Sequence, residues 1–498
     1  MIDKMSWLIV YPEIFLLVMA CVITLVDLFD KSRKRSVTYL LTLATLLVLA
    51  AVQARYALAD QTLYGFSGML VSDPMGNWLK CFAALAMFAT MVYSRDYSAD
   101  RDMLRRGGEL FILGLFALLG IFVMISGNSL LMVYMGLELL TLPSYALVAL
   151  RRNDGVATEA GMKYFVLGSM ASGFLLYGMS MLYGATGTLI INDVLQVIAS
   201  GMAKPIILML ALVFIVAGLA FKLGAVPFHM WMPDIYQGAP TSVALMVAGA
   251  PKLAAFAIMV RLLVEGLLPA AEQWQHMLIV LAVASLLVGN LAAVMQTNLK
   301  RMLAYSTIAQ IGFVLLGFSV GYNNGQYALV VDAYSASMFY VVTYVLTTLV
   351  NFGIIMLLAR EGVECDKIND LAGLNQRSPL LAGLMALSLL SLAGIPPMVG
   401  FYAKLTVLQV LMATGTTLHI GLAIFAVIMS LIGAFYYLRV IKVMYFDAPS
   451  EALPERIEAS LDARAVLTVN GALVLVLGLL PAGLMALCAR AIYGMLAG

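Results

Sequence analysis

Four ionisable residues lie deep inside long apolar stretches of the sequence: Glu138, Lys222, Lys252 and Lys404. A charge at mid-depth in a bilayer costs about 3 kcal/mol or more unless it is paired or wetted, and such residues mark ion and proton pathways. A helix bundle has no structural need for three buried ammonium groups. The pattern therefore indicates a proton relay, with Glu138 and Lys222 as its natural pair. The alternative for Glu138 is a neutral carboxyl that hydrogen-bonds a neighbouring helix.

The relay chemistry follows from the residue types. A carboxylate close to Lys222 favours the protonated ammonium, so a change in their separation would switch the lysine between holding and releasing a proton. Lys252 and Lys404 could pass charge sideways through water and through the hydroxyls of Tyr305, Ser306, Thr307 and Tyr402. Moving a proton against the membrane potential costs about 2.3 kcal/mol per 100 mV, so an ion gradient or another subunit must supply the energy.

Five further charged or titratable residues in the apolar stretches have weaker signals. Lys163 lies about 9 Å inside its stretch at 1.5 Å per residue, so an aqueous cavity and a snorkelling side chain are equally good readings. His229 could serve proton uptake from the cytoplasm or could simply be a hydrogen-bonded histidine. Lys80 and Arg261 lie near the ends of their stretches, which predicts snorkelling to the headgroups. Glu13 is expected only to cap or anchor its helix.

Composition sets the class of protein. With 63% hydrophobic and 11% charged residues, the 498-residue chain is predicted to be an all-α polytopic membrane protein that contacts the lipid bilayer directly. A net charge of +2 argues against nucleic-acid partners. The four cysteines are far apart and show no metal-ligand spacing, and the glycine patterns that cradle dinucleotides or triphosphates are absent from the sequence. Redox or ATP chemistry is therefore expected in other chains.

Apolar windows long enough to cross a bilayer recur from end to end, and about fourteen are predicted. Most of the 29 Lys and Arg residues fall in the odd-numbered loops, which predicts that both termini lie outside the cytoplasm. The predicted windows are 6–26, 37–54, 77–94, 109–126, 129–149, 158–183, 203–236, 240–265, 275–295, 302–320, 328–359, 378–412, 418–438 and 465–489.

The seventh and twelfth windows are too long for one straight crossing, so each is predicted to be a broken helix. Pro227 marks the first break, and Pro396 and Pro397 mark the second. Windows four to eight and nine to thirteen then form two five-helix blocks of opposite orientation, an inverted repeat of the kind found in secondary transporters. The expected organisation is a three-helix flank (1–108), a first half-channel (109–265), a second, inverted half-channel (266–445) and a C-terminal loop with the last helix (446–498).

The stretches FKLGAVPFHMWMPDIYQGAPTSVALMVAGAPKLAAFAIMVRL and QTNLKRMLAYSTIAQIGF resemble the proton-conducting membrane domain of a known family. This family comprises the antiporter-like subunits of respiratory complex I and of multisubunit cation/proton antiporters, and the resemblance covers roughly windows four to thirteen. Three details resemble the N-type branch of NADH:quinone oxidoreductase, which is related to mitochondrial ND2. They are the opening YPEIFLLVMACVITLVDLF, the proline before the lysine in GAPKLAAF, and Lys404 where M-type members have a glutamate.

The resemblance implies roles for individual residues. Glu138 and Lys222 would be the coupled pair of the first half-channel, Lys252 the central lysine and Lys404 the terminal lysine of the second, while Lys163 matches a further lysine that the family implicates. It also implies a proton-translocating subunit in the bacterial inner membrane, with both termini periplasmic, that packs against M-type and small K/J-type sibling subunits. NADH, FMN, iron–sulfur clusters and quinone would be handled by partner subunits, with no cofactor in this chain. The alternatives are a subunit of a gradient-driven sodium/proton antiporter and a purely structural membrane subunit.

Overall fold

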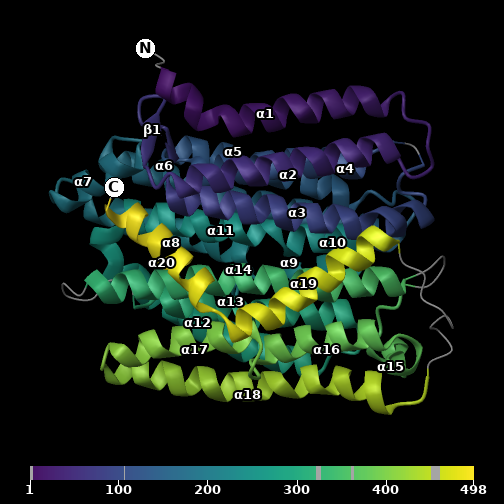
Figure 1. Ribbon diagram of the computed structural model, residues 1–498. Helices are drawn as coiled ribbons and strands as arrows, with labels where there is room; N and C mark the ends of the chain where they lie inside the picture. The colour runs from purple at the N-terminus through teal and green to yellow at the C-terminus, as the bar shows by residue number, and fades with distance from the viewer. Residues whose placement is uncertain (1–3, 106, 321–326, 360–363, 450–459, 498) are drawn as a thin grey trace.

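The computed structural model describes residues 4–105, 107–320, 327–359, 364–449 and 460–497. Its long helices run side by side in one direction, as expected for a bundle that spans a bilayer (Figure 1). Within the described residues, thirteen helices are long and apolar enough to cross a membrane. The predicted all-α membrane fold is confirmed, apart from one short hairpin.

The N-terminal third of the chain forms six helices and that hairpin. Its two strands pair antiparallel, with Leu63 opposite Ser72. The elements are α1 (Lys4–Asp27), α2 (Ser36–Leu58), β1 (Leu63–Gly65), β2 (Leu70–Ser72), α3 (Pro74–Asp100), α4 (Glu109–Ser126), α5 (Leu130–Val148) and α6 (Gly155–Thr186).

The seventh window contains two helices separated by a break, as predicted. The eighth window is also interrupted, at Gly249, and ends in a π-helical segment. The elements are α7 (Ile191–Ala199), α8 (Pro205–Leu223), α9 (Trp231–Gly238), α10 (Thr241–Ala248), α11 (Ala250–Met259), the π-helical segment (Val260–Gly266) and a 3₁₀ turn (Leu268–Ala270).

The last part of the chain contains the second predicted break, between α16 and α17. Each of these two helices has 15 residues, too few to cross a bilayer alone, so together they replace the twelfth window. The elements are α12 (Ala271–Val294), α13 (Leu299–Phe318), α14 (Tyr327–Leu358), a 3₁₀ turn (Ile368–Leu371), α15 (Leu374–Arg377), α16 (Pro379–Ala393), α17 (Val399–Ala413), α18 (Thr417–Phe446), α19 (Leu461–Leu479) and α20 (Ala482–Ala497).

The prediction of a single helix over 465–489 is wrong. Two helices, α19 and α20, meet there at an angle (Figure 1), because Pro481 cannot continue the helical hydrogen bonding. The hairpin and the short amphipathic helix α7 were not predicted either, since neither is long enough to give a window of membrane length.

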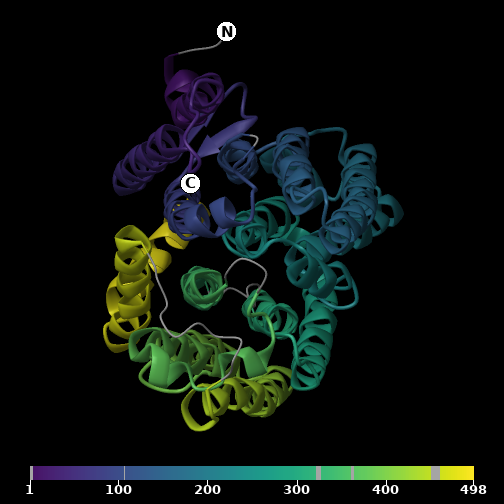
Figure 2. The same cartoon turned by 90° about the vertical axis from the view of Figure 1, so that its right-hand side faces the viewer.

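One helix forms the centre of the bundle. Viewed end-on in Figure 2, helices from the middle and the end of the chain form a ring around the green helix α14, and the purple N-terminal helices α1 and α2 lie outside this ring. Of the 18-residue apolar window in α14, 89% is buried, and α14 contacts α3, α10, α11, α13, α16, α17, α19 and α20. The two broken helices therefore lie in a bundle built around a shared central helix.

Candidate proton-relay site

The first helix break leaves backbone carbonyls free inside the bundle. Helix α8 ends at Leu223, where Gly224 adopts a left-handed conformation (φ 82°), and helical structure resumes at Trp231. The last carbonyls of a helix have no partner within that helix. The Leu223 carbonyl accepts a hydrogen bond from Nζ of Lys252 on α11, at 2.8 Å. A buried lysine thus satisfies the opened end of α8.

The second break repeats this arrangement. Helix α16 ends at Ala393, and Gly394 is again left-handed (φ 84°). Nζ of Lys404 donates to the carbonyls of Leu392 (2.9 Å) and Ala393 (3.0 Å) and to Oγ of Ser430 on α18 (2.8 Å). An ammonium group has three N–H donors, so Lys404 is fully hydrogen-bonded at the break.

Lys222 and Glu138 lie near each other without contact. Lys222 is in the last turn of α8 and lines a cavity of about 20 Å³ together with Thr141, which is room for about one water molecule. Thr141 also donates to Oε2 of Glu138 at 3.5 Å, while Oε1 is buried without a hydrogen-bond partner. Within the described residues no ion pair joins Lys222 to Glu138, although Glu138 is within electrostatic range of Lys222. Their coupling as a pair stays a prediction.

Lys163 is placed at a partly exposed cluster of charges. Its side chain is 44% exposed, and Nζ pairs with Glu159 and with Asp234, each at 2.9 Å. Asp234 on α9 also binds Arg301 at 2.7 Å. The carboxylate of Asp234 therefore ties α6 and α13 to the second half of the broken helix. Sequence reasoning missed Asp234, although it lies in the same WMPDIY segment that follows the break.

His229 lies within the first break, beside the exposed Pro227. Its Nδ1 is buried and has no hydrogen-bond partner among the described residues. Whether His229 serves proton uptake or is only a hydrogen-bonded histidine stays a prediction. Pro396 and Pro397 lie at the corresponding place in the second break, where both are exposed at the bundle surface.

The hydroxyl groups expected to connect the lysines fall into two sets. Ser306 bonds Tyr437 at 2.5 Å and Thr307 bonds Tyr344 at 2.7 Å, all four buried. Tyr305, in contrast, packs beneath the guanidinium of Arg301, and Tyr402 packs against the ring of Phe339. Ser306 and Thr307 thus belong to a buried polar network. Within the described residues, neither Tyr305 nor Tyr402 makes a hydroxyl hydrogen bond to this network.

The prediction that Lys80 snorkels is wrong. Lys80 is 1% exposed, and its Nζ pairs with Oε1 of Glu13 on α1 at 2.5 Å and bonds the hydroxyl of Ser126 on α4. Position along the sequence places a residue near a helix end but does not say whether it faces lipid or protein. Glu13, expected only to cap or anchor, is the partner that makes burial of this ammonium possible.

Snorkelling is also wrong for Arg261. Its guanidinium is 1% exposed and pairs with Asp73 at 2.5 Å and with Glu265 at 2.6 Å. Asp73 caps the first turn of α3 by accepting from the backbone N–H of Gly76. Together these ion pairs join α3 to the π-helical segment at the end of the eighth window.

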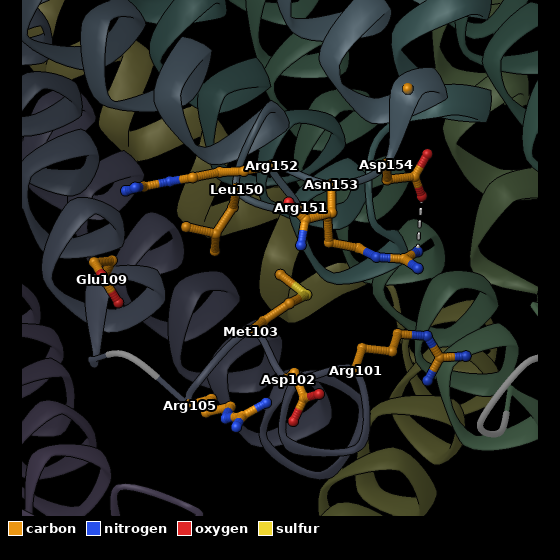
Figure 3. A pocket seen from close by; sticks show the side chains of 11 residues that line it. Arg101, Asp102, Met103, Arg105, Glu109, Leu150, Arg151, Arg152, Asn153 and Asp154 are labelled. Atoms are coloured by element: carbon orange, nitrogen blue, oxygen red, sulfur yellow. Dashed lines mark ion pairs between the residues drawn. The ribbon is translucent and has the colours of Figure 1, made fainter.

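A wide polar cavity of about 560 Å³ lies away from the relay residues, where α3 and α5 end and α4 and α6 begin. Figure 3 shows Arg101, Arg105, Arg151 and Arg152 around it. Arg101 and Arg151 both bind Glu364, at 2.9 and 3.1 Å. Burial raises the pKa of Glu364, but Arg101, Lys300 and the hydrogen bond from Tyr97 outweigh it and hold that pKa below its ordinary value.

In the part of the chain that the structure describes, no three His, Cys, Asp or Glu side chains come together in a way that could hold a metal ion. The chemistry available at the two breaks is proton binding and transfer by lysine, hydroxyl and carboxyl groups.

The sequence matches the transmembrane family of NADH:quinone oxidoreductase and Mrp antiporters over residues 127–441. The chain belongs to this family. It is 66% identical over 492 residues to NADH-quinone oxidoreductase subunit N of Polaromonas naphthalenivorans (strain CJ2), covering 99% of this chain and 98% of that protein. It is 56% identical to subunit N of Herminiimonas arsenicoxydans, over 99% of this chain and 100% of that one. The N-type resemblance is thereby confirmed.

Solved structures of family members agree with the fold. A chain of respiratory complex I from Thermus thermophilus with bound aureothin is 31% identical, with a TM-score of 0.79 over 96% of this chain and 99% of that one. A chain of the Mrp complex from Dietzia sp. DQ12-45-1b superposes with a TM-score of 0.85 over 98% of this chain and 97% of that one, at 21% identity. The second likeness shows the fold alone.

Proposed function

We propose that this chain is a proton-translocating membrane subunit of an NADH:quinone oxidoreductase and that Glu138, Lys222, Lys252 and Lys404 relay the protons. The full-length relatives named subunit N support the subunit assignment. One structural observation supports the proposed relay. Each helix break has its carbonyls bound by a buried lysine, Lys252 at the first and Lys404 at the second.

The arrangement suits a group that must alternately hold and release a proton. A protonated lysine is stabilised at these sites because the carbonyl oxygens freed by the breaks accept its N–H groups. Release of the proton requires the lysine to break one of its hydrogen bonds to these carbonyls. In the first half, Thr141 donates to Glu138 and lines the same small cavity as Lys222. A shorter distance between Glu138 and Lys222 would favour the protonated lysine, and a longer distance would favour release of its proton.

The organisation of the chain is part of the proposal. Residues 109–265 form the first half-channel and residues 266–445 the second, inverted one, flanked by residues 1–108 and 446–498. Both termini face the periplasm of a bacterial inner membrane, as the distribution of Lys and Arg favours. The subunit packs against M-type and small K/J-type siblings, and NADH, FMN, iron–sulfur clusters and quinone reside in other subunits. Lys163 and His229 act at the cytoplasmic uptake side.

A gradient-driven sodium/proton antiporter is the weaker alternative. The Mrp complex chain supports it only through the shared fold, at 21% identity. The relatives that match the whole chain at 66% and 56% identity carry the NADH-quinone oxidoreductase name. They favour a redox-driven role.

Sealed vesicles that contain the assembled complex test the proposed function. We expect NADH to drive proton uptake into inverted vesicles, and a sodium gradient alone to drive none. The variant Lys404→Met should abolish pumping, whereas Lys204→Met, an exposed lysine at the start of α8, should pump normally. Sodium-driven pH change without NADH, or normal pumping by Lys404→Met, would contradict the proposal.

A further inference from the structure

A buried glutamine lies at the junction between the second break and the hydroxyl network. Gln310 on α13 is 5% exposed, and its Nε2 donates to the Leu392 carbonyl and to the hydroxyl of Tyr437, each at 3.0 Å. Its Oε1 accepts a hydrogen bond from the hydroxyl of Tyr340. A carbonyl oxygen cannot donate, so the amide nitrogen must face Leu392, and the orientation of the side chain is fixed.

Gln310 and Lys404 share one acceptor. The Leu392 carbonyl receives Nε2 of Gln310 and Nζ of Lys404, at 3.0 and 2.9 Å. A carbonyl oxygen has two lone pairs, so both are used. If Lys404 turns away to release a proton, Gln310 still satisfies this buried carbonyl, and an unpaired buried carbonyl is costly. Gln310 therefore makes it easier for Lys404 to leave the break.

The other side of Gln310 faces groups that can pass a proton. Tyr437 contacts Ser306 at 2.5 Å. Two cavities of about 10 Å³ each adjoin Leu392, each with room for about one water molecule. One is lined by Gln310 and Tyr340, and the other by Ser306. The hydroxyl network is thus connected to Lys404 through the amide of Gln310 and through the Leu392 carbonyl, which that amide binds.

We propose that Gln310 is a positioning residue for Lys404, holding the Leu392 carbonyl in place and aligning the hydroxyls of Tyr340 and Tyr437 for proton transfer to and from the lysine. The carboxamide itself neither gains nor loses a proton. This inference rests on the proposed proton-translocating function and adds a neutral residue to its second half.

The variant Gln310→Leu tests the inference, because leucine is similar in size to glutamine but removes every hydrogen bond of the amide. We expect a several-fold loss of NADH:quinone turnover and of proton pumping per assembled complex. Gln53→Leu is the matched control. Gln53 is a fully buried glutamine on α2 whose two polar atoms have no hydrogen-bond partner among the described residues, so its replacement should leave both rates unchanged.

The variant Gln310→Glu separates positioning from packing. A protonated glutamic acid can still donate to the Leu392 carbonyl, whereas an ionised one faces it with an acceptor and holds the proton on Lys404. The titratable groups around this position are Lys404, Tyr340, Tyr344 and Tyr437. Relative to the unmodified complex, Gln310→Glu should turn over faster at about pH 6 than at about pH 8. A purely structural role predicts the same ratio at both.

Tyr340→Phe gives a milder test if Gln310→Leu does not assemble. It removes only the hydroxyl that orients the amide, and we expect reduced pumping per assembled complex. Unmodified rates in Gln310→Leu or Tyr340→Phe, or a pH-independent ratio in Gln310→Glu, would overturn the inference. If Lys404→Met is inactive at the same time, the proposed function stands without Gln310. If Lys404→Met also pumps normally, the proposed relay itself fails.

Discussion

Nζ of Lys252 lies 2.8 Å from the carbonyl oxygen of Leu223, the last residue of α8. The lysine comes from a different helix, α11, so the hydrogen bond links the broken seventh window to the eighth. At the second break, the lysine belongs to the following half-helix, α17, and binds the end of α16. The two breaks thus use the same contact, between a buried ammonium and a helix end, but draw the lysine from different elements.

The pair Glu138 and Lys222 gives the first prediction. Glu138→Gln removes the charge that favours protonated Lys222, and Lys222→Met removes the proton-binding group. Because a positioned proton-transfer group typically contributes about 10²-fold or more, both variants should lower pumping and NADH:quinone turnover at least about tenfold per assembled complex. Glu138→Asp keeps the charge with a shorter reach and should be less impaired than Glu138→Gln. Unmodified rates in both Glu138→Gln and Lys222→Met would show that this pair is not the route.

The second break gives the next prediction. Replacing Pro396 and Pro397 by alanine restores two backbone N–H donors, which allows a continuous helix to take back the carbonyls that Lys404 now binds. We expect lower pumping with normal insertion, measured as proton uptake per assembled complex. Pro379→Ala is the control, because Pro379 lies at the first position of α16, where no N–H bond is lost. Full activity of the double variant would remove the role of the break.

The buried pair of Lys80 and Glu13 should stabilise the subunit rather than conduct protons. Lys80→Met leaves the Glu13 carboxylate buried without its partner, which typically costs about 3–5 kcal/mol. We expect less assembled complex and a lower melting temperature, with unchanged turnover per assembled complex. Combining Lys80→Met with Glu13→Leu should restore much of the stability, since no buried charge remains. Normal stability of Lys80→Met alone would favour the snorkelling position that the structure excludes.

The proposed orientation can be tested by labelling single cysteines in intact cells. Native Cys365 is an unsuitable probe, because it is 2% exposed and its Sγ bonds the Leu358 carbonyl. With Cys21 replaced by serine, a membrane-impermeant maleimide should label Ser200→Cys after α7 but not Asn153→Cys between α5 and α6. Both positions are exposed. The reverse labelling pattern would place the termini in the cytoplasm.

The features that could be predicted from the sequence are those with a local signal. Proline and glycine interrupt an apolar run, so the breaks at Pro227 and Pro397 are visible in the sequence. A lysine in the middle of such a run is equally visible, so Lys252 and Lys404 stand out in the sequence. In the structure both bind the broken helix ends.

The features that could not be predicted depend on partners distant in the chain. Glu13 and Lys80 are 67 residues apart, and Arg261 and Asp73 are 188 apart, so nothing local shows that these charges are paired and buried. Gln310 is neutral, so its burial lacks the large energetic cost that marks a buried charge in the sequence. Its spacing from Ser306 and Thr307 places the three on one helix face, and this is the only local sign of the network.

The central position of α14 has a consequence for how the molecule is made. Membrane helices are synthesised in order, and α3, α10 and α11 emerge before α14, whereas α16, α17, α19 and α20 follow it. The surfaces of α3 and α11 that pack on α14 must therefore face lipid or an insertion factor until residue 358 has left the ribosome. The ring cannot close completely until α20, the last helix of the chain, has been made.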